Sequence, residues 1–275
     1  MRTKCHAKIN LFLKVLGRRA DGYHEIETLF QEIDLADELV WTPSEDAPQL
    51  TVTGADLGDP QQNLVLRAAE RFRQSAGLAV GGRFALHKRI PAGSGLGGGS
   101  ADAAAVLRLM NRYCGEPLGG NDLLALAAEI GSDVPFFLKG GCRLGKGRGE
   151  RLSPFSLESA ARTGFLFFPN CPLSTAEVYR AHQGPPSLPG SGKLGENDLL
   201  QSALTVSGEF RKIYEKLAAL FRGELFFMTG SGSTLVWLTH EKALDERRKK
   251  TLERLAVGTL FFRFREAVRP HPPLV

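Results

Sequence analysis

The 275 residues are 43% hydrophobic, which is enough for one large domain or two modest ones with their own cores. A net charge of +5 allows a nucleic-acid partner, but the basic residues are scattered except at 246–250, where a solvated helix face is the simpler interpretation. No apolar run reaches about 18 residues, which argues against a membrane-spanning helix. We therefore expect neither a nucleic-acid nor a membrane partner, and a monomer or a weak homodimer.

The first half of the chain alternates between strand-like and helix-like patterns at irregular spacing. Strands are expected at 7–15, 32–41, 50–52, 84–90 and near 142–144. Helices are expected at 64–76, 100–113 and 121–130. The polar segment 145–159 then reads as a candidate domain boundary.

The second half continues the mixed pattern. Strands are expected at 163–168, 225–228, 235–238 and 260–264, and helices at 198–205, 210–221 and 241–255. A segment rich in Pro and Gly at 184–195 predicts a mobile loop, and the Pro-rich end at 270–275 is expected to fray. This irregular order favours an α+β fold, with domains at 1–150 and 151–275.

The spacing of the four cysteines does not indicate a functional site. They lie far apart and form no CxxC pair, which argues against a zinc site or a disulfide framework. Reduced thiols of this kind are typical of a cytoplasmic protein.

The most informative stretch is 91–102, where five of twelve residues are Gly and a helix pattern follows directly. Gly permits positive φ, so successive N–H groups can turn toward one point, and a helix N-terminus behind them favours an anion. Either Gly99 or Ser100 is expected to cap that helix. We predict a phosphate site formed by Pro91, Ala92, Gly93, Ser94, Gly95, Leu96, Gly97, Gly98, Gly99, Ser100 and Ala101.

Other interpretations of this glycine loop are weaker. The run 93–98 formally matches G-x-G-x-x-G, but the acidic residue near the expected distance, Glu116, lies in a turn rather than after a second strand. A Walker A loop is excluded because no Gly-Lys-Ser/Thr follows. A tight turn that allows close helix packing remains the structural alternative.

Two polar positions each allow two interpretations. Lys8 and Asn10 share one face of the strand at 7–15, as either an exposed edge or a buried functional pair. Asp133 lies between Gly131 and Pro135, where it is either a helix N-cap or a general base. By themselves, the turn that ends in Tyr23 and His24 is a surface turn, and the Gly-Ser-Gly-Ser run at 230–233 is a hairpin loop.

Taken in order along the chain, these motifs resemble the GHMP kinase superfamily. They are Ala-Lys-Ile-Asn-Leu at 7–11, Gly-Leu-Gly-Gly-Gly-Ser at 95–100, Gly-Ser-Asp-Val-Pro-Phe-Phe at 131–137 and Met-Thr-Gly-Ser-Gly-Ser at 228–233. Further motifs at 19–25, 29–31, 62–64 and 196–199 are similar to the branch that phosphorylates a cytidine-diphosphate-linked methylerythritol in non-mevalonate isoprenoid biosynthesis. The resemblance extends from residue 7 to about residue 238.

The resemblance implies a two-domain α+β GHMP kinase fold with the active site in the interdomain cleft. It implies transfer of the γ-phosphoryl group of ATP, with Mg²⁺, to the C2 hydroxyl of the acceptor. Asp133 would be the base, and Lys8 would hold it ionised and meet the transferred phosphate. The glycine loop would wrap the triphosphate, with Ser100 near Mg²⁺. No acidic metal ligand is identified.

The resemblance also assigns residues to the two bases. Asn63, Leu64 and Lys88 would lie near adenine. Tyr23 and Tyr179 match the aromatic residues that stack on cytosine, His24 would read the cytosine edge, and Asn10 would hold the acceptor end.

Two alternatives stay open at this point. One is another small-molecule kinase of the superfamily, of the homoserine or mevalonate type, although the Tyr-His pair at 23–24 and the motif 197–199 argue against it. The other is a non-catalytic nucleotide-binding regulator, which the retention of Lys8 and Asp133 disfavours.

Overall fold

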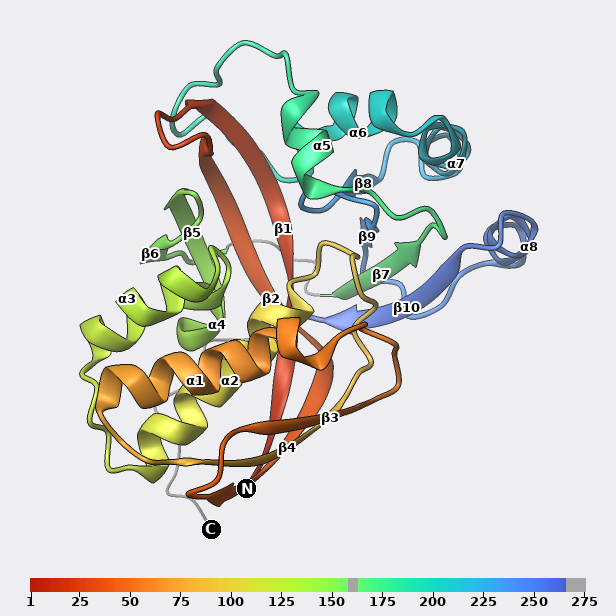
Figure 1. Ribbon diagram of the computed structural model, residues 1–275. Helices are drawn as coiled ribbons and strands as arrows, with labels where there is room; N and C mark the ends of the chain where they lie inside the picture. The colour runs from red at the N-terminus through yellow and green to blue at the C-terminus, as the bar shows by residue number, and fades with distance from the viewer. Residues whose placement is uncertain (158–162, 266–275) are drawn as a thin grey trace.

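A computed structural model describes residues 1–157 and 163–265. Its backbone is organised by two long antiparallel strands, β1 (Arg2–Arg18) and β2 (His24–Ser44), which cross most of the molecule in Figure 1. Around them lie β3 (Gln49–Thr53), β4 (Gly81–His87), β5 (Cys142–Gly147) and β6 (Arg151–Pro154). The strand order is β3-β4-β2-β5-β6, with β1 paired to β2 off this path. Only β3 and β4 run parallel within this sheet.

Helices of the first half cluster beside this sheet, where two of them contact its strands directly and the others pack mainly on those helices (Figure 1). They are the 3-10 turn η1 (Pro60–Gln62), α1 (Leu64–Ala76), α2 (Gly98–Tyr113), α3 (Gly120–Ile130) and α4 (Val134–Lys139). The apolar residues between helices and sheet form one buried cluster, in which Trp41 stacks on Phe84 at 5.7 Å between ring centroids. Helix α1 buries one face, as its periodicity predicts, whereas α2 is buried on nearly all sides from Ala101 to Asn111, beyond the single face that its spacing indicated.

The second half forms a four-stranded antiparallel sheet covered by short helices. Its order is β10 (Gly258–Arg263), β7 (Thr163–Phe168), β9 (Leu235–Leu238) and β8 (Leu225–Met228). The helices are α5 (Thr175–Arg180), α6 (Leu200–Val206), α7 (Gly208–Leu220) and α8 (Glu246–Arg254). Mixed sheets and helices confirm the predicted α+β class. None of the helices in the described parts of the chain has the length and apolarity needed to span a membrane.

The two sheets share a buried contact. An apolar cluster between them contains Ile9 and Leu11 of β1 together with Leu166, Val236 and Phe262 of the second sheet. The proposed boundary at residue 150 lies in the turn between β5 and β6, so the first sheet continues to its last strand beyond that point. The division into domains at 1–150 and 151–275 stays a prediction.

The strands at 7–15 and 32–41 are much longer than their sequence patterns indicated. In β2, every residue from Ile26 to Ile33 is buried, so polar and apolar residues do not alternate there. Strands buried on both faces lose the period of two on which the pattern depends.

Other boundaries moved because of local capping. The helix expected at 241–255 begins at Glu246, because the Asp245 side chain accepts the N–H of Arg248. The segment 184–195 forms no helix or strand, but its backbone N–H groups at Ser187 and Gly195 donate to β1 carbonyls. The expected fraying at 270–275, and residues 158–159 of the predicted boundary segment, lie outside the described residues.

Candidate active site

A cavity of about 1040 Å³ lies where the glycine loop meets β1, α5 and the loop between β8 and β9. Its lining includes every residue of the glycine loop from Pro91 to Ser100. Predicted site residues from both halves of the chain also line it: Lys8, Asn10, Tyr23, His24, Leu64, Lys88, Asp133 and Tyr179. Two predicted residues do not. Ala101 is buried in α2, and Asn63 caps α1 by accepting the N–H of Val65 at 3.0 Å.

The glycine loop depends on backbone conformations that favour Gly. Gly93, Gly95 and Gly97 have φ of 67°, 77° and 74°. Gly97 is the N-cap of α2, two positions before the earlier of the two predicted caps, and no side chain caps the helix. The first residues of α2, Gly98 to Ser100, line the cavity. Their uncapped N–H groups give this end of the cavity the character of an anion site.

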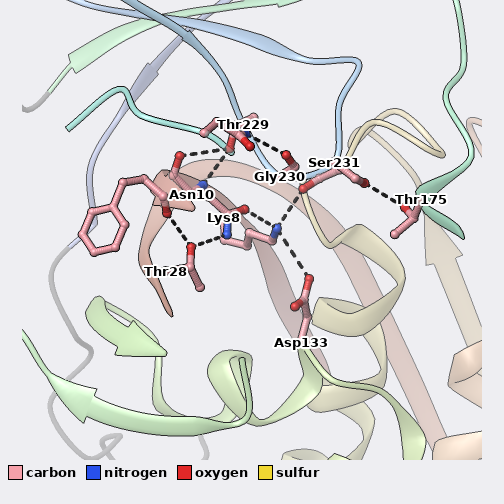
Figure 2. Close-up of polar contacts among 11 residues, drawn as sticks. Lys8, Asn10, Thr28, Asp133, Thr175, Thr229, Gly230 and Ser231 are labelled. Carbon is pink, nitrogen blue, oxygen red and sulfur yellow. Dashed lines mark hydrogen bonds and ion pairs between the residues drawn. The ribbon is translucent and has the colours of Figure 1, made fainter. Parts of the chain in front are cut away.

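Lys8 joins this loop to the polar centre of the cavity (Figure 2). Its side chain is 5% exposed, and Nζ donates to Asn10 Oδ1 at 2.7 Å and to the Gly95 carbonyl at 2.9 Å. Lys8 Nζ also lies 3.5 Å from Asp133 Oδ2. The structure excludes the exposed-edge interpretation, because Lys8 and Asn10 form a buried polar pair, and the function of that pair stays a prediction. Register shifts in β1 on either side of this pair mark β-bulges, which are frequent beside active sites.

Asp133 lies at the N-cap position of α4 but makes no capping hydrogen bond. Its side chain is 32% exposed and pairs with Lys8 across the cavity. The carboxylate is therefore free of a purely structural capping role, and it keeps oxygen lone pairs that a ligand in the cavity can reach.

A hydroxyl network below Asn10 was not predicted from the sequence. The Asn10 side-chain amide donates to Thr28 Oγ1 at 2.7 Å, and its backbone N–H donates to Thr229 Oγ1 at 2.6 Å. Thr229 belongs to the motif at 228–233, which carried a resemblance but no assigned role. No local pattern connects residues about 220 positions apart, so only the fold could bring these groups together.

The loop between β8 and β9 is held against the glycine loop by further side chains. Thr234 Oγ1 donates to the Ser94 carbonyl at 2.7 Å. The amide of Asn197 donates to the carbonyls of Met228 and Gly230 at 2.9 and 2.8 Å. Asn197 belongs to the sequence motif at 196–199, and these contacts give that motif a structural role.

Aromatic residues gather at the other end of the cavity. The rings of His24 and Tyr179 lie 5.1 Å apart, whereas Tyr23 is 54% exposed. Burial lowers the pKa of His24, and His182 and Arg18 lower it further, which favours a neutral imidazole that both donates and accepts. Burial and the charge of Asp133 raise the pKa of Tyr179 well above its usual value, so its phenol stays protonated.

Lys88 lines the cavity, but two buried carboxylates hold its ammonium group. Nζ contacts Asp37 Oδ2 closely and lies 2.7 Å from Asp102 Oδ2. The second oxygen of Asp37 accepts the N–H groups of Arg89 and Ile90, so this cluster connects β2, the start of the glycine loop and α2. Burial, with a contribution from Asp37, outweighs the attraction of Lys88 and raises the pKa of Asp102 to about 6.

No ready-made metal site accompanies these groups. Among residues 1–157 and 163–265, no three His, Cys, Asp or Glu side chains are arranged to hold a metal ion. All four cysteines are free thiols, as the sequence indicated.

Comparisons with known proteins agree with this geometry. Residues 63–141 match the model of the GHMP kinases N terminal domain. A 4-diphosphocytidyl-2-C-methyl-D-erythritol kinase of Alkalilimnicola ehrlichii is 40% identical, over 82% of this chain and 78% of its own length. The enzyme of that name from Methylacidiphilum infernorum is 38% identical over 83% of each chain.

Solved structures extend the comparison to nearly the whole chain. A crystal structure of 4-(cytidine 5'-diphospho)-2C-methyl-D-erythritol kinase has a TM-score of 0.74 and 35% identity, over 96% of this chain and 99% of its own. A homoserine kinase from Cytophaga hutchinsonii, at 19% identity and a TM-score of 0.64, shares the fold alone. This chain therefore belongs to the 4-diphosphocytidyl-2-C-methyl-D-erythritol kinase family, a branch of the GHMP kinases.

Proposed function

We propose that this protein transfers the γ-phosphoryl group of ATP to the C2 hydroxyl of 4-diphosphocytidyl-2-C-methyl-D-erythritol, a step of non-mevalonate isoprenoid biosynthesis. As a member of its family, the chain is an ATP-dependent kinase. The observation that carries the proposal is the position of Lys8, which contacts the glycine loop, Asn10 and Asp133 within one cavity.

In this proposal Asp133 accepts the proton of the acceptor hydroxyl. As the O–H bond breaks, the oxygen attacks the γ-phosphorus and a new P–O bond forms, while the bond from the γ-phosphorus to the bridging oxygen breaks and ADP leaves with that oxygen. Lys8 supports the step in two ways. Its ammonium group lies 3.5 Å from the carboxylate of Asp133 and so fixes the position of that base, and it balances charge on the transferred phosphoryl group. The acceptor is a tertiary alcohol, so its orientation by Asn10 matters as much as basicity.

The glycine loop is proposed to bind the triphosphate through backbone N–H groups of the loop and of the first turn of α2. ATP would enter as its Mg²⁺ complex, and the metal would neutralise part of the phosphate charge. Mg²⁺ usually keeps several waters and is held by few protein oxygens plus substrate phosphates, a pattern that the single hydroxyl of Ser100 fits. An all-protein acidic cage is not needed for this chemistry.

The aromatic end of the cavity is proposed to hold the cytosine. Stacking on Tyr23 and Tyr179 tolerates any base, so selection depends on the edge contact of His24. A neutral His24 offers one donor and one acceptor, which suits the mixed hydrogen-bonding edge of cytosine.

The test is a kinase assay with purified protein, ATP, Mg²⁺ and the proposed acceptor, in which ADP release is measured. We expect turnover by the wild type and a loss of about 10²–10⁴-fold in kcat for Asp133→Asn, with ATP binding kept. Asp122→Asn, an exposed residue of α3 outside the cavity, is the matched control. Full activity of Asp133→Asn would contradict the assignment of the base, and no turnover by the wild type would contradict the function.

A further inference from the structure

The charges that line the cavity are unbalanced. Its only carboxylate among the described residues is Asp133, and its cations are Lys8, Arg18, Lys88, Arg148 and Arg180. Lys8 pairs with Asp133, and Lys88 pairs with the buried carboxylates of Asp37 and Asp102, which do not line the cavity. Within residues 1–157 and 163–265, none of the three arginines has a carboxylate at ion-pair distance. The excess positive charge is therefore carried by arginines alone.

These three arginines all lie at the aromatic end of the cavity. Arg18 is the register partner of His24 across the β1–β2 pair, and its charge lowers the pKa of that histidine. Arg180 directly follows Tyr179 on α5. The guanidinium of Arg148 lies over the ring of Tyr23, 4.9 Å from its centroid. The charge of Arg148 helps to lower the pKa of the exposed Asp21, and that carboxylate is already held in an ion pair by Arg19.

A tight turn fixes the backbone of Arg148. The residue occupies the turn between β5 and β6, flanked by Gly147 and Gly149 with φ of 77° and 110°. A Cβ on Gly147 would lie 2.7 Å from a carboxylate oxygen of Glu150, and the N–H of Arg148 donates to the other oxygen at 2.6 Å. This tight turn presents the half-buried Arg148 side chain to the cavity.

We propose that Arg148 binds the diphosphate of the acceptor nucleotide, with Arg18 and Arg180 adding positive charge at the same end. A guanidinium has five N–H donors in a planar fork, which matches phosphate oxygens in pairs. The group lies over the ring of Tyr23, and within residues 1–157 and 163–265 no hydrogen bond or ion pair uses its N–H groups, which leaves them for the ligand. The identity of the nucleotide rests on the proposed function, whereas the anion site rests on the charges alone.

A purely structural alternative exists for Arg148. Its cation–π contact fixes the ring of Tyr23, and this contact would help any cytosine compound equally, with or without phosphates. The diphosphate proposal instead requires that Arg148 distinguish charged from uncharged ligands. Cytidine, CMP and CDP carry the same base and different numbers of phosphates, so they separate the two roles.

The experiment measures binding of cytidine, CMP and CDP by calorimetry to the wild type and to Arg148→Gln. We expect the wild type to prefer CDP over cytidine. In the variant, this preference should fall by about 10- to 100-fold, the range for losing hydrogen bonds to a charged group, while cytidine affinity stays within about twofold. Arg148→Lys should recover only part of the preference, because it keeps the charge and loses the fork. An equal loss for cytidine and CDP would overturn the proposal.

Controls separate this inference from the proposed function. Lys212→Gln removes a positive charge from an exposed position on α7 outside the cavity and should leave all three affinities unchanged. The binding assay needs no turnover, so it tests the diphosphate site independently of the kinase assay. If the wild type selects CDP through Arg148 but releases no ADP in the kinase assay, the diphosphate site is supported and the proposed acceptor is wrong. A wild type that binds cytidine and CDP equally well overturns the diphosphate site. In the kinase assay, Arg148→Gln should raise KM for the acceptor by the same factor and leave KM for ATP unchanged.

Discussion

Replacing Gly97 by Ala should damage this protein through two separate physical effects. The residue has φ of 74°, a conformation that costs an L-residue about 1–2 kcal/mol. A Cβ at this position would also lie 2.7 Å from Cζ of Phe137, which is closer than real contacts allow. The ring cannot swing away freely, because it is buried and packs against Phe136 at 5.1 Å. Overpacking of this kind costs about 1–3 kcal/mol.

Other glycines of the same loop separate these effects. Gly93 has φ of 67°, but a Cβ added there would have no neighbouring atom within 4 Å, so Gly93→Ala should show only the conformational cost of about 1–2 kcal/mol. A Cβ on Gly99 would meet only Leu64 Cδ1, at an ordinary 3.6 Å. Because Gly99 lies inside α2, its replacement by Ala should stabilise the helix by about 0.5–1 kcal/mol.

Urea unfolding of the three variants tests this order. The free energy of unfolding should rise slightly for Gly99→Ala, fall for Gly93→Ala, and fall furthest for Gly97→Ala, by about 2–5 kcal/mol in total. In Gly97→Ala, the new methyl group would also lie 3.3 Å from Cε of Lys8, so kcat should fall even where the protein remains folded. Equal stabilities of Gly93→Ala and Gly97→Ala would refute the argument that contact with Phe137 limits this position.

Three further predictions concern the remaining groups of the site. Lys8→Met should lower kcat by about 10²–10³-fold without loss of the folded state in circular dichroism, since it removes a cation that balances phosphoryl charge; a smaller loss than tenfold would speak against that role. Tyr23→Ala should weaken cytidine binding by about 1–3 kcal/mol and leave ATP affinity unchanged. His24→Ala should instead reduce the preference for cytidine over uridine compounds in the same binding assay. A wild type without that preference would remove the case for a cytosine pocket. The folded state raises the pKa of Asp102 to about 6, so its contribution to stability is present at low pH and is lost as the pH rises. Relative to Asp102→Asn, the free energy of unfolding measured with urea should therefore fall by about 1.4 kcal/mol per pH unit between about pH 4 and 6. If the wild type and the variant show the same pH dependence across this range, the assignment is wrong.

The sequence predicted best those features that are local. The glycine loop, the helix that follows it and the position of Asp133 between Gly131 and Pro135 can each be recognised from neighbouring residues. In the structure, the loop, the first turn of that helix and Asp133 line one cavity. Lys8 and Asn10 were found as a pair because a strand brings alternate residues to one face.

The features that escaped prediction depend on distant contacts. Whether Asp133 caps α4 could not be decided until Lys8 was seen opposite it. Lys88 gave no sign of its partners Asp37 and Asp102, since one lies on β2 and the other on α2. The position of Arg148 over Tyr23 joins two turns that are about 125 residues apart.

The hydroxyl network that joins Asn10 to Thr229 has a consequence for how the protein is made. The chain is synthesised from its N-terminus, so the glycine loop and the first sheet leave the ribosome before the second half of the chain has been completed. Until β8 follows, the backbone N–H of Asn10 lacks the oxygen that it binds in the finished molecule. Leaving such a buried donor without a partner costs about 1–3 kcal/mol, which favours water around β1 over a closed site. The nascent chain should therefore close its reaction centre only after residues 225–238 are available to pack against β1.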